Sequence, residues 1–432
     1  MFCRFKSKGI NSTPKLPNFR YTYKCIAQSP IAGHFDKAFI HFNCPIPLAY
    51  LYSHRMKYYL IAGEASGDLH GSNLIKEIKK RDGGAHVRCW GGELMQDAGA
   101  TLIKHYRDLA FMGFAEVIKN LPTILRNLRF CKQDIATFNP DVVVLIDYPG
   151  FNLRIAEWAK TQGYKIVYYI SPQVWAWKEG RVKKIRRVVD KMLVILPFEK
   201  KFFEDKWQYP VAYVGHPLVK VIEEARETAS EVKLQKGKLD TSKKIIALLP
   251  GSRKQEVAVK LPLMLEGVAS FTNYQIVVAA APALPTTFYN TLLEGYAFAS
   301  LTQPGQTYNL LSAAHAALVT SGTATLETAL FAVPQVVCYK GSALSYQIAK
   351  RIITIKYISL VNLIMNKPVV RELIQHELTP GNIAKALEPL LEEDAQRNHM
   401  LEDYHQLKAL LHTGGDASAK AAAAVLQTAK SA

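Results

Sequence analysis

The sequence predicts an α/β protein with mostly parallel sheets, divided into two domains of similar size that face each other across a cleft. From Lys57 onward, short apolar runs alternate with longer amphipathic stretches, which is typical of strands and helices that take turns along a chain. The apolar runs are continuous in Val, Ile and Leu, as expected for parallel strands buried on both faces. A polar break at 223–244 separates two such halves. A chain of 432 residues is also too long for one small core.

The expected strands fall into two groups. In the first half they are Tyr58–Ala62, Val142–Ile146, Lys165–Ile170, Met192–Leu196 and Val211–Val214, and in the second half Ile245–Leu249, Gln275–Ala279, Ala317–Thr320 and Gln335–Cys338. Helices are expected at Ser72–Lys80, Ile155–Thr161 and Thr323–Phe331. The predicted domains are therefore 56–225 and 240–400, followed by a helix-forming segment, 401–432, that can pack across either domain.

Residues 1–55 differ from the rest of the chain. They hold eight Lys or Arg and one Asp, which gives +7 of the formal net charge of +18. The segment also contains five prolines, and it shows neither the period of a helix nor that of a strand. We interpret them as an extension, either disordered or the product of a start assigned too early, because Met56 directly precedes the first strand. A targeting leader is the alternative, but a small-residue cleavage site is missing. The scattered cysteines fit a reduced cytoplasmic setting.

The loop after the first strand, "AGEASGDLHG", is a candidate binding loop. Gly63, Ser66 and Gly67 have small or no side chains, so a substrate can approach the backbone closely. Asp68 can cap the next helix. The loop matches neither the dinucleotide fingerprint nor the phosphate-binding loop. Because Glu64 and Asp68 would repel a pyrophosphate, we expect a sugar or hydroxyl group here. The alternative is a tight strand-to-helix turn.

Asp147 ends a buried strand in "LIDYPGFN" and is the candidate catalytic residue. In an open parallel sheet, ligands bind at the carboxyl ends of the strands. A carboxylate at that place can take a proton from an attacking hydroxyl. The alternative is an aspartate that caps the next helix or bonds to its own turn.

Two loops in the second half are candidates for binding a nucleotide. In "VTSGTATLETAL" a strand runs into Ser321, Gly322 and Thr323 and then into a helix that bears Glu327. The free N–H groups of a helix N-terminus suit a diphosphate, and Glu327 could accept hydrogen bonds from ribose hydroxyls. In "LPGSRKQEV", Arg253 could neutralise phosphate charge. The alternative for the first loop is a plain capped helix.

Two basic stretches also carry apolar residues, and they suggest a surface for an anionic bilayer. The basic residues are Lys119, Arg126 and Arg129 in the first stretch, and Lys183, Lys184, Arg186 and Arg187 in the second. The alternative is an ordinary solvated helix face. We expect no nucleic-acid partner, because no helix-turn-helix, zinc-finger or RNA-recognition signature is present.

Taken in order, these loops resemble the lipid-A-disaccharide synthases, a family of bacterial glycosyltransferases. The matching segments, in the same order as in the family, are "AGEASGDLHG", "FMGFAEV", "IDYPGFN", "YYISPQVWAWKEGRVKKI", "LPFEKKFF", "VGHPL", "LLPGSRKQEV", "SGTATLE" and "YISLVNLI". The order is more specific than any single motif, and residues 1–55 have no counterpart.

The resemblance implies a GT-B fold of two Rossmann-like domains and an inverting transfer. The donor would be UDP-2,3-diacylglucosamine and the acceptor 2,3-diacylglucosamine 1-phosphate (lipid X). The products would be the β-1,6-linked lipid A disaccharide 1-phosphate and UDP. It also implies a cytoplasmic protein, peripheral on the anionic inner membrane, and a homodimer that exchanges C-terminal segments. No cofactor is expected, and the absence of a D-x-D acid pair predicts transfer without a metal.

The same resemblance assigns roles to individual residues. Asp147 matches an aspartate proposed as general base, Arg253 and Asn362 match positions linked to activity, and Ser321, Gly322, Thr323 and Glu327 match the nucleotide-binding loop and helix. Two departures are Gly150, where many relatives carry an acid, and Ala65, where some carry Thr. The rival interpretations are a UDP-sugar epimerase of the same fold and a non-catalytic binder of acidic lipid or nucleic acid.

Overall fold

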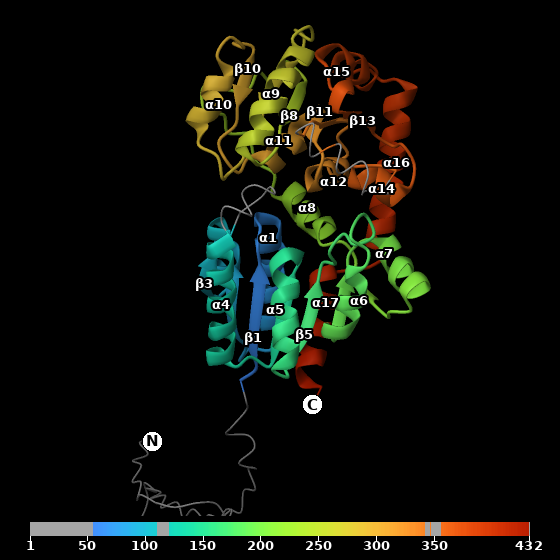
Figure 1. Cartoon of the computed structure of the whole chain (residues 1–432). Coiled ribbons are helices and arrows are strands. Elements are labelled where there is room, and N and C mark those ends of the chain that lie inside the picture. Colours follow the sequence, from blue (N-terminus) through green and yellow to red (C-terminus); the bar gives the residue numbers. More distant parts are fainter. Residues whose placement is uncertain (1–54, 110–120, 342–345, 347–355, 432) are drawn as a thin grey trace, which may run out of the picture. The chain divides into compact units, whose positions relative to one another are not determined.

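The computed structural model describes residues 55–109, 121–341, 346 and 356–431, and it contains two parallel β-sheets (Figure 1). The first sheet has the order β3-β2-β1-β4-β5-β6-β7 and the second the order β10-β9-β8-β11-β12-β13. The first comprises β1 (Lys57–Ala62), β2 (His86–Gly91), β3 (Thr101–His105), β4 (Val142–Ile146), β5 (Lys165–Tyr169), β6 (Lys191–Val194) and β7 (Ala212–Tyr213). The second comprises β8 (Ile245–Leu249), β9 (Gln275–Val278), β10 (Ala299–Leu301), β11 (Ala314–Thr320), β12 (Gln335–Tyr339) and β13 (Arg371–Ile374).

Helices connect the strands and cover the sheets. They are α1 (Ala65–Arg81), α2 (Glu93–Asp97), α4 (Leu121–Phe138), α5 (Pro149–Thr161), α6 (Arg181–Val188), α7 (Pro197–Lys201), α8 (Leu218–Glu227), α9 (Lys254–Val268), α10 (Thr286–Leu293), α11 (Thr307–Ala313), α12 (Thr323–Leu330), α14 (Leu360–Met365), α15 (Pro380–Leu387), α16 (Ala395–His412) and α17 (Ala417–Lys430). Within the described residues, no helix combines the length and the apolar character needed to cross a bilayer.

The central strands are buried on both faces, as their continuous apolar runs predict. All five residues of β4, "VVVLI", and of β8, "IIALL", are buried. Along β1, Tyr58 and Leu60 belong to one hydrophobic cluster, while Tyr59 and Ile61 belong to another on the opposite face. Because successive side chains of a strand point to opposite faces, both faces of the first sheet are covered.

Each sheet reverses its strand order at one place. In the first sheet β1 lies between β2 and β4, and in the second sheet β8 lies between β9 and β11. In open parallel sheets, ligands bind at such switch points, outside the carboxyl ends of the strands. The loops after β1, β4, β8 and β11 are therefore the places where the fold favours a binding site.

The α/β class with parallel sheets is confirmed, and each predicted strand overlaps a strand of the structure. Four strands were missed, namely β2, β3, β10 and β13, and each has a physical reason. The edge strands β3, β10 and β13 are short or partly exposed, and β2, "HVRCWG", is interrupted by Arg88. The polar break expected at 223–244 is also partly helical, because α8 continues to Glu227.

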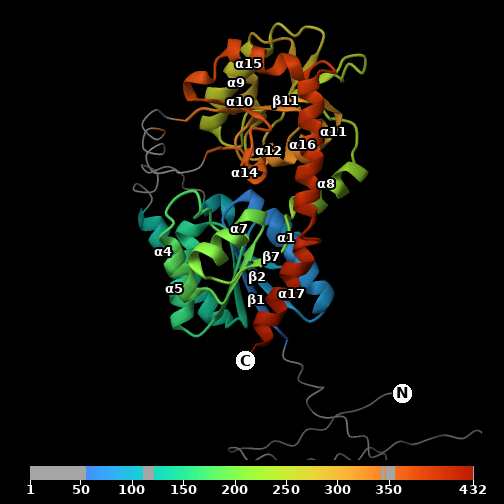
Figure 2. The same cartoon turned by 90° about the vertical axis from the view of Figure 1, so that its right-hand side faces the viewer.

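The last helix, α17, returns to the first sheet (Figure 2). It packs against α1 and β5, with Ala421, Ala422 and Val425 fully buried. The backbone at Gly414 lies so close to Gly215 that a Cβ on either glycine would collide with the other segment. The C-terminal segment thus contacts both halves, the first through α17 and the second through α16, which packs against α12 and α14. Exchange of this segment in a dimer stays a prediction.

Candidate active site

The loop after β1 is shaped by a tyrosine that lies on it. A Cβ on Gly63 would collide with the ring of Tyr148, whose hydroxyl donates to the Leu109 carbonyl oxygen at 3.1 Å. Glu64 is the N-cap residue of α1, Ser66 is partly exposed, and Gly67 packs against Ala62. Glycine at 63 is therefore required for the close approach of the two loops that follow β1 and β4.

Asp68 does not cap the helix that follows its own strand, contrary to the sequence prediction. It lies inside the first turn of α1, is 2% exposed, and binds the N-terminus of α2. Its Oδ1 accepts from the backbone N–H of Gly92 at 2.7 Å and of Met95 at 3.1 Å, and its Oδ2 accepts from Leu94 at 3.2 Å. These donors lie more than 20 residues away, so local pattern could not reveal them. The carboxylate thus fastens α2 to α1.

Asp147 directly follows β4, in a strained backbone. Both Asp147 (φ 43°) and Tyr148 (φ 48°) are left-handed, which is uncommon for residues with a Cβ. The Asp147 carbonyl oxygen accepts from the Tyr168 hydroxyl at 2.6 Å and from Asn152 Nδ2 at 2.8 Å. These two buried side chains hold the turn in place. Strain maintained by the surroundings is common at functional sites.

Burial raises the pKa of the Asp147 carboxyl to about 7, and the negative charge of Glu64 adds to the rise. The opposing influence is a hydrogen bond from the backbone of Tyr148, which lowers the pKa. Since a general base is most effective when its pKa is near the working pH, this carboxyl has the acidity that proton abstraction needs. The Glu64 pKa is also raised by burial, and Arg253 opposes that rise.

A second carboxylate, Glu199, lies close enough to Asp147 for their charges to interact, and sequence reasoning did not single it out. It is 1% exposed, on α7, and accepts from Trp175 Nε1 at 3.1 Å and from the Leu196 N–H at 3.0 Å. It therefore anchors the "SPQVWAWKEGR" loop beside Asp147. The only indication in the sequence was that Glu199 belongs to "LPFEKKFF", one of the segments that match the family. Its neighbours in the sequence do not distinguish it from a glutamate on the surface.

In the second half, Arg253 is the N-cap residue of α9, in the loop after β8. Its Nη1 donates to Glu256 Oε1 at 2.9 Å, and its Nη2 lies 4.0 Å from Glu64 Oε2. The side chain is about half exposed, so its guanidinium is accessible to a ligand. Arg253 thus brings a cation from the β8 loop to the carboxylate of the β1 loop.

Ser321, Gly322 and Thr323 form the turn between β11 and α12. Gly322 is the N-cap residue with φ 147°, and both Gly322 and Thr323 are exposed. Ser321 Oγ donates to the Ile358 carbonyl oxygen at 3.1 Å. One turn into α12, Glu327 accepts from the Tyr308 hydroxyl at 3.1 Å, and burial raises its pKa. The start of α12 is therefore open to solvent at Gly322 and Thr323, and Glu327 lies about one turn further into the helix.

Asn362 is placed differently from the other candidates. It is 1% exposed, and its side-chain amide bonds to Val370 and Glu372 inside the protein. Gly150 lies at the start of α5, where a Cβ would meet no atom of the described residues within 4 Å, so a larger side chain would fit there.

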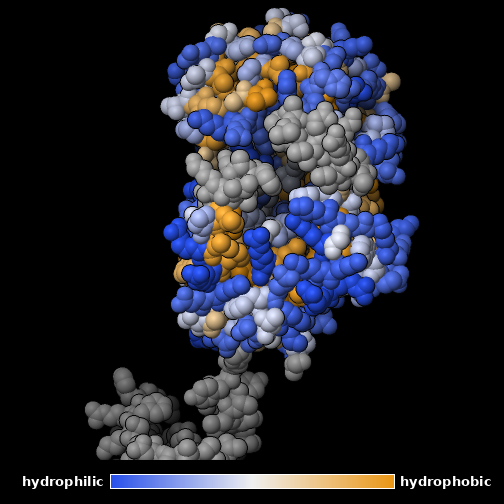
Figure 3. Space-filling view, in the orientation of Figure 1, coloured by the Kyte–Doolittle hydropathy of each residue, from blue (hydrophilic) through white to orange (hydrophobic). Residues whose placement is uncertain are grey.

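The two basic stretches have different surfaces. On α4, the apolar residues Leu121, Leu125 and Phe130 are 45–54% exposed and lie beside exposed Arg126 and Arg129. Figure 3 shows this apolar patch over α4, with hydrophilic residues around it. Lys119 lies outside the described residues.

On α6, the apolar residues Val182, Ile185 and Val188 point into the core instead. Lys184 and Arg187 pair with Glu157 at 3.0 and 3.2 Å, and Arg186 donates to the Trp207 carbonyl oxygen at 3.1 Å. Lys183 is exposed. The solvated-face alternative therefore describes α6 better than α4.

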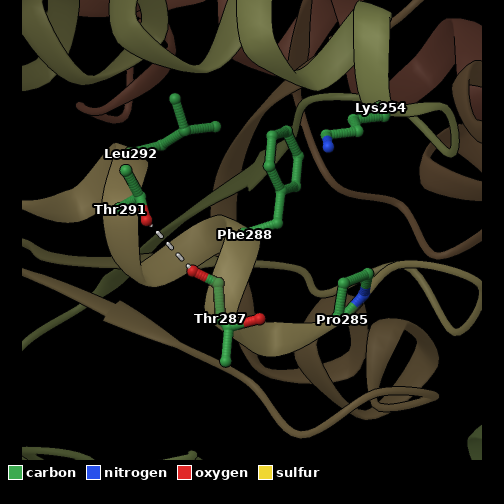
Figure 4. Close-up of a pocket in the computed structure, with 6 residues that line it drawn as sticks. All are labelled: Lys254, Pro285, Thr287, Phe288, Thr291 and Leu292. Atoms are coloured by element: carbon green, nitrogen blue, oxygen red, sulfur yellow. Dashed lines mark hydrogen bonds between the residues drawn. The ribbon is translucent and has the colours of Figure 1, made fainter.

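A hollow of about 360 Å³ lies between the start of α9 and α10 (Figure 4). It is lined by Lys254, Pro285, Thr287, Phe288, Thr291 and Leu292, and the Lys254 ammonium lies 5.4 Å from the centre of the Phe288 ring. It contains none of the predicted site residues, although Lys254 directly follows Arg253.

Solved structures share this two-sheet fold. The glycotransferase of kitacinnamycin superposes with a TM-score of 0.60 at 13% identity, over 87% of this chain and 99% of that one. The UDP-GlcNAc 2-epimerase from Neisseria meningitidis, bound to UDP-GlcNAc, superposes with a TM-score of 0.57 at 13% identity, over 86% and 99%. The fold is thus the GT-B arrangement found in glycosyltransferases and in sugar-nucleotide epimerases.

Sequence relatives decide between these classes. A curated lipid-A-disaccharide synthase from Trichlorobacter lovleyi is 38% identical over 360 residues, which cover 82% of this chain and 93% of that protein. The model of the lipid-A-disaccharide synthetase family matches residues 58–426. The chain belongs to the lipid-A-disaccharide synthetase family, and it is a glycosyltransferase.

Proposed function

We propose that this enzyme transfers 2,3-diacylglucosamine from UDP-2,3-diacylglucosamine to the 6-hydroxyl of 2,3-diacylglucosamine 1-phosphate, lipid X. The products are the β-1,6-linked disaccharide 1-phosphate and UDP. The observation that carries the proposal is the Asp147 carboxyl, which lies at a switch point of the fold with a pKa of about 7. In a member of the lipid-A-disaccharide synthetase family, a carboxyl with this pKa supports a role as the base that accepts the proton of the acceptor hydroxyl.

Asp147 acts as general base in a single displacement. The acceptor hydroxyl gives its proton to the carboxylate and attacks the anomeric carbon from the face opposite the departing UDP, which inverts an α-linked donor to a β product. Proton transfer of this kind contributes about 10²–10⁴-fold to the rate. Glu64, Gly63 and Ser66 shape the acceptor side of the site.

The diphosphate of UDP binds at the N-terminus of α12, where Gly322 and Thr323 present their backbone. Arg253 supplies positive charge as the leaving group develops negative charge, and Glu327 accepts from ribose hydroxyls. Preorganised donors and cations are effective because they need no rearrangement in the transition state. The leaving group is thus stabilised without a divalent metal, in keeping with the absence of a D-x-D pair in the sequence.

This assignment divides the chain into an acceptor domain, 56–225, and a UDP-sugar domain, 240–400. The contact between Glu64 and Arg253 supports the division, because it brings the acceptor loop and the donor loop within 4.0 Å of each other. The two reacting sugars would then meet at this contact.

Both substrates carry acyl chains, so the enzyme works at a bilayer. We propose that α4 lies on the anionic cytoplasmic face of the inner membrane. Its exposed Leu121, Leu125 and Phe130 enter the interface, while Arg126 and Arg129 bind headgroups. Because Lys184 and Arg187 of α6 pair with Glu157, we expect α6 to contribute less than α4 to binding the membrane.

The epimerase alternative is not favoured. The solved epimerase shares the fold at 13% identity, whereas the relative at 38% identity is a curated lipid-A-disaccharide synthase. An epimerase would also need no lipid acceptor.

The test uses the full chain in detergent with UDP-2,3-diacylglucosamine, and measures UDP release with and without lipid X. We expect release only with lipid X, a disaccharide product, and no loss of rate in EDTA. Acceptor-independent conversion of the sugar would support an epimerase instead, and an EDTA-sensitive rate would overturn metal-independent transfer.

A further inference from the structure

Asn362 and Glu372 form a hydrogen-bond network beneath the Ser321 loop. Asn362 Nδ2 donates to the Val370 carbonyl oxygen and to Glu372 Oε1, both at 2.9 Å, and its Oδ1 accepts from the Val370 N–H at 2.9 Å. Because only 1% of Asn362 is exposed, its side-chain amide makes these hydrogen bonds inside the protein. Asn362 therefore has no free donor or acceptor directed at a substrate.

The Glu372 carboxylate holds the turn that leads into α14. Its Oε1 accepts from the Ser359 N–H at 2.9 Å, and both of its oxygens accept from the Ile358 N–H, at 3.2 and 3.1 Å. Hydrogen bonds from backbone N–H groups to an ionised carboxylate are stronger than those to a neutral oxygen. The position of Ile358 is thus set by Glu372.

Ile358 carries this constraint to the nucleotide loop. Its N–H is held by Glu372, and its carbonyl oxygen accepts from Ser321 Oγ at 3.1 Å. A single residue therefore separates the partly buried Glu372 carboxylate from the serine that begins the turn into α12. No sequence motif pointed to this relation, because Ser321 directly follows β11 whereas Glu372 lies within β13, far along the chain.

We infer that Glu372 is a positioning residue for the UDP diphosphate: it acts through Ile358 on the Ser321 turn, and Asn362 acts through Glu372. The inference rests on the proposed function, in which that turn binds UDP. Without the carboxylate, the N–H groups of Ile358 and Ser359 lose their partner, and the turn relaxes. The Ile358 carbonyl then leaves Ser321, and the first N–H groups of α12 are no longer preorganised for the phosphates.

The test is Glu372→Gln, which keeps the shape of the side chain but turns an N–H group toward the N–H of Ile358. The Kd of UDP would be measured by titration calorimetry, together with KM for lipid X and the thermal midpoint. We expect the Kd of UDP to rise about tenfold, since one mispaired hydrogen bond in a partly buried site has that effect. KM for lipid X should stay within about twofold. Glu377→Gln is the control, because Glu377 pairs with Arg371 near the surface, 3.6 Å away, and does not contact Ile358.

The outcomes separate this inference from the proposed function. If the unaltered enzyme does not bind UDP, the proposed function fails. If it binds UDP and folded Glu372→Gln binds UDP within about twofold of it, the positioning role is overturned, whatever the change in thermal midpoint.

A measurement on the unaltered enzyme keeps the inference testable if Glu372→Gln does not fold. Because coupling between two sites is reciprocal, UDP should slow hydrogen exchange at the amides of Ile358 and Ser359. Unchanged exchange at saturating UDP would overturn the inference.

Discussion

Glu64 Oε2 and Arg253 Nη2 lie 4.0 Å apart, so the loop after the first strand of one sheet meets the loop after the first strand of the other. Glu64 also acts on Asp147, whose pKa it raises further after burial has raised it. One side chain thus contacts the cation proposed for the leaving group and influences the acidity of the proposed base. The acceptor side and the donor side are electrostatically connected through it.

Replacing Glu64 should shift the pH profile of the reaction. In Glu64→Gln, Asp147 loses a nearby negative charge, so its pKa falls and the acid limb of kcat/KM against pH moves to lower pH. Burial still holds that pKa above its usual range, so the limb stays above pH 4. Glu377→Gln makes the same change in net charge, but Glu377 is not among the groups that shift the pKa of Asp147, so it should leave the limb in place. An unmoved limb in Glu64→Gln would contradict this coupling.

Asp147→Asn should lower kcat by about 10²-fold or more, because the base is lost while the shape is kept. It should also stabilise the protein at pH 8. The folded pKa of about 7 lies above the ordinary value, so the folded state binds the proton more tightly between about pH 4 and 7. The stability from Asp147 therefore falls as the pH rises through that range. We expect a gain of about 1–3 kcal/mol at pH 8 in urea unfolding. Near-normal turnover would refute the assignment.

Two glycine substitutions form a matched pair. Gly63→Ala pushes the Tyr148 ring away from the loop and disturbs the neighbouring Asp147, so we expect a loss of about 1–3 kcal/mol and a reduced kcat. Gly150→Ala, three residues after Asp147, meets no atom within 4 Å among the residues that the structure describes, and it lies in the first turn of α5. It should be neutral, or stabilising by up to about 1 kcal/mol. If the two variants had the same stability and the same activity, the Tyr148 ring would not be what prevents a Cβ at position 63.

Two buried histidines should make the fold sensitive to acid. Burial lowers the pKa of His216 to about 3 and of His70 to about 4, so both stay neutral in the folded protein. The unfolded chain gains protons below about pH 6.5, and stability falls as the pH drops from there toward 4.

His216→Asn preserves an acceptor for the Leu218 N–H, which His216 Nδ1 accepts at 3.3 Å. It should reduce the slope of unfolding free energy against pH in this range by about 1.4 kcal/mol per unit. Exposed His405→Asn is the control, and an equal effect from both variants would contradict the explanation.

Membrane binding should depend on α4 more than on α6. Arg126→Gln with Arg129→Gln should weaken binding to vesicles that contain anionic phospholipid by about tenfold or more, at about 1 kcal/mol for each cation. Arg186→Gln with Arg187→Gln removes the same charge, yet these cations already contact Trp207 and Glu157. Cosedimentation that is reduced equally by both pairs would show that net charge alone directs the protein to lipid.

The strands in the middle of each sheet could be predicted because burial on both faces leaves a continuous apolar run, as in Val142–Ile146. Edge strands such as β3, "TLIKH", have no continuous apolar run, because an edge strand has a neighbouring strand on one side only and is partly exposed. The candidate loops followed from the strand ends, which are local features. The partners of Asp68, the Glu157 pairs of α6 and the network of Glu372 each join residues far apart in the sequence. A sequence pattern relates only residues that are close together in the sequence, within one turn or one strand. It therefore could not predict these contacts.

The return of α17 to the first sheet bears on how the protein is made. Residues 57–213 complete the first sheet, but Ala421, Ala422 and Val425, which cover α1 and β5, are synthesised last. While the ribosome produces the second half, the first half has an uncovered apolar face that only the end of the chain can close. A nascent chain stopped before residue 417 therefore leaves this apolar face of the first sheet exposed to solvent.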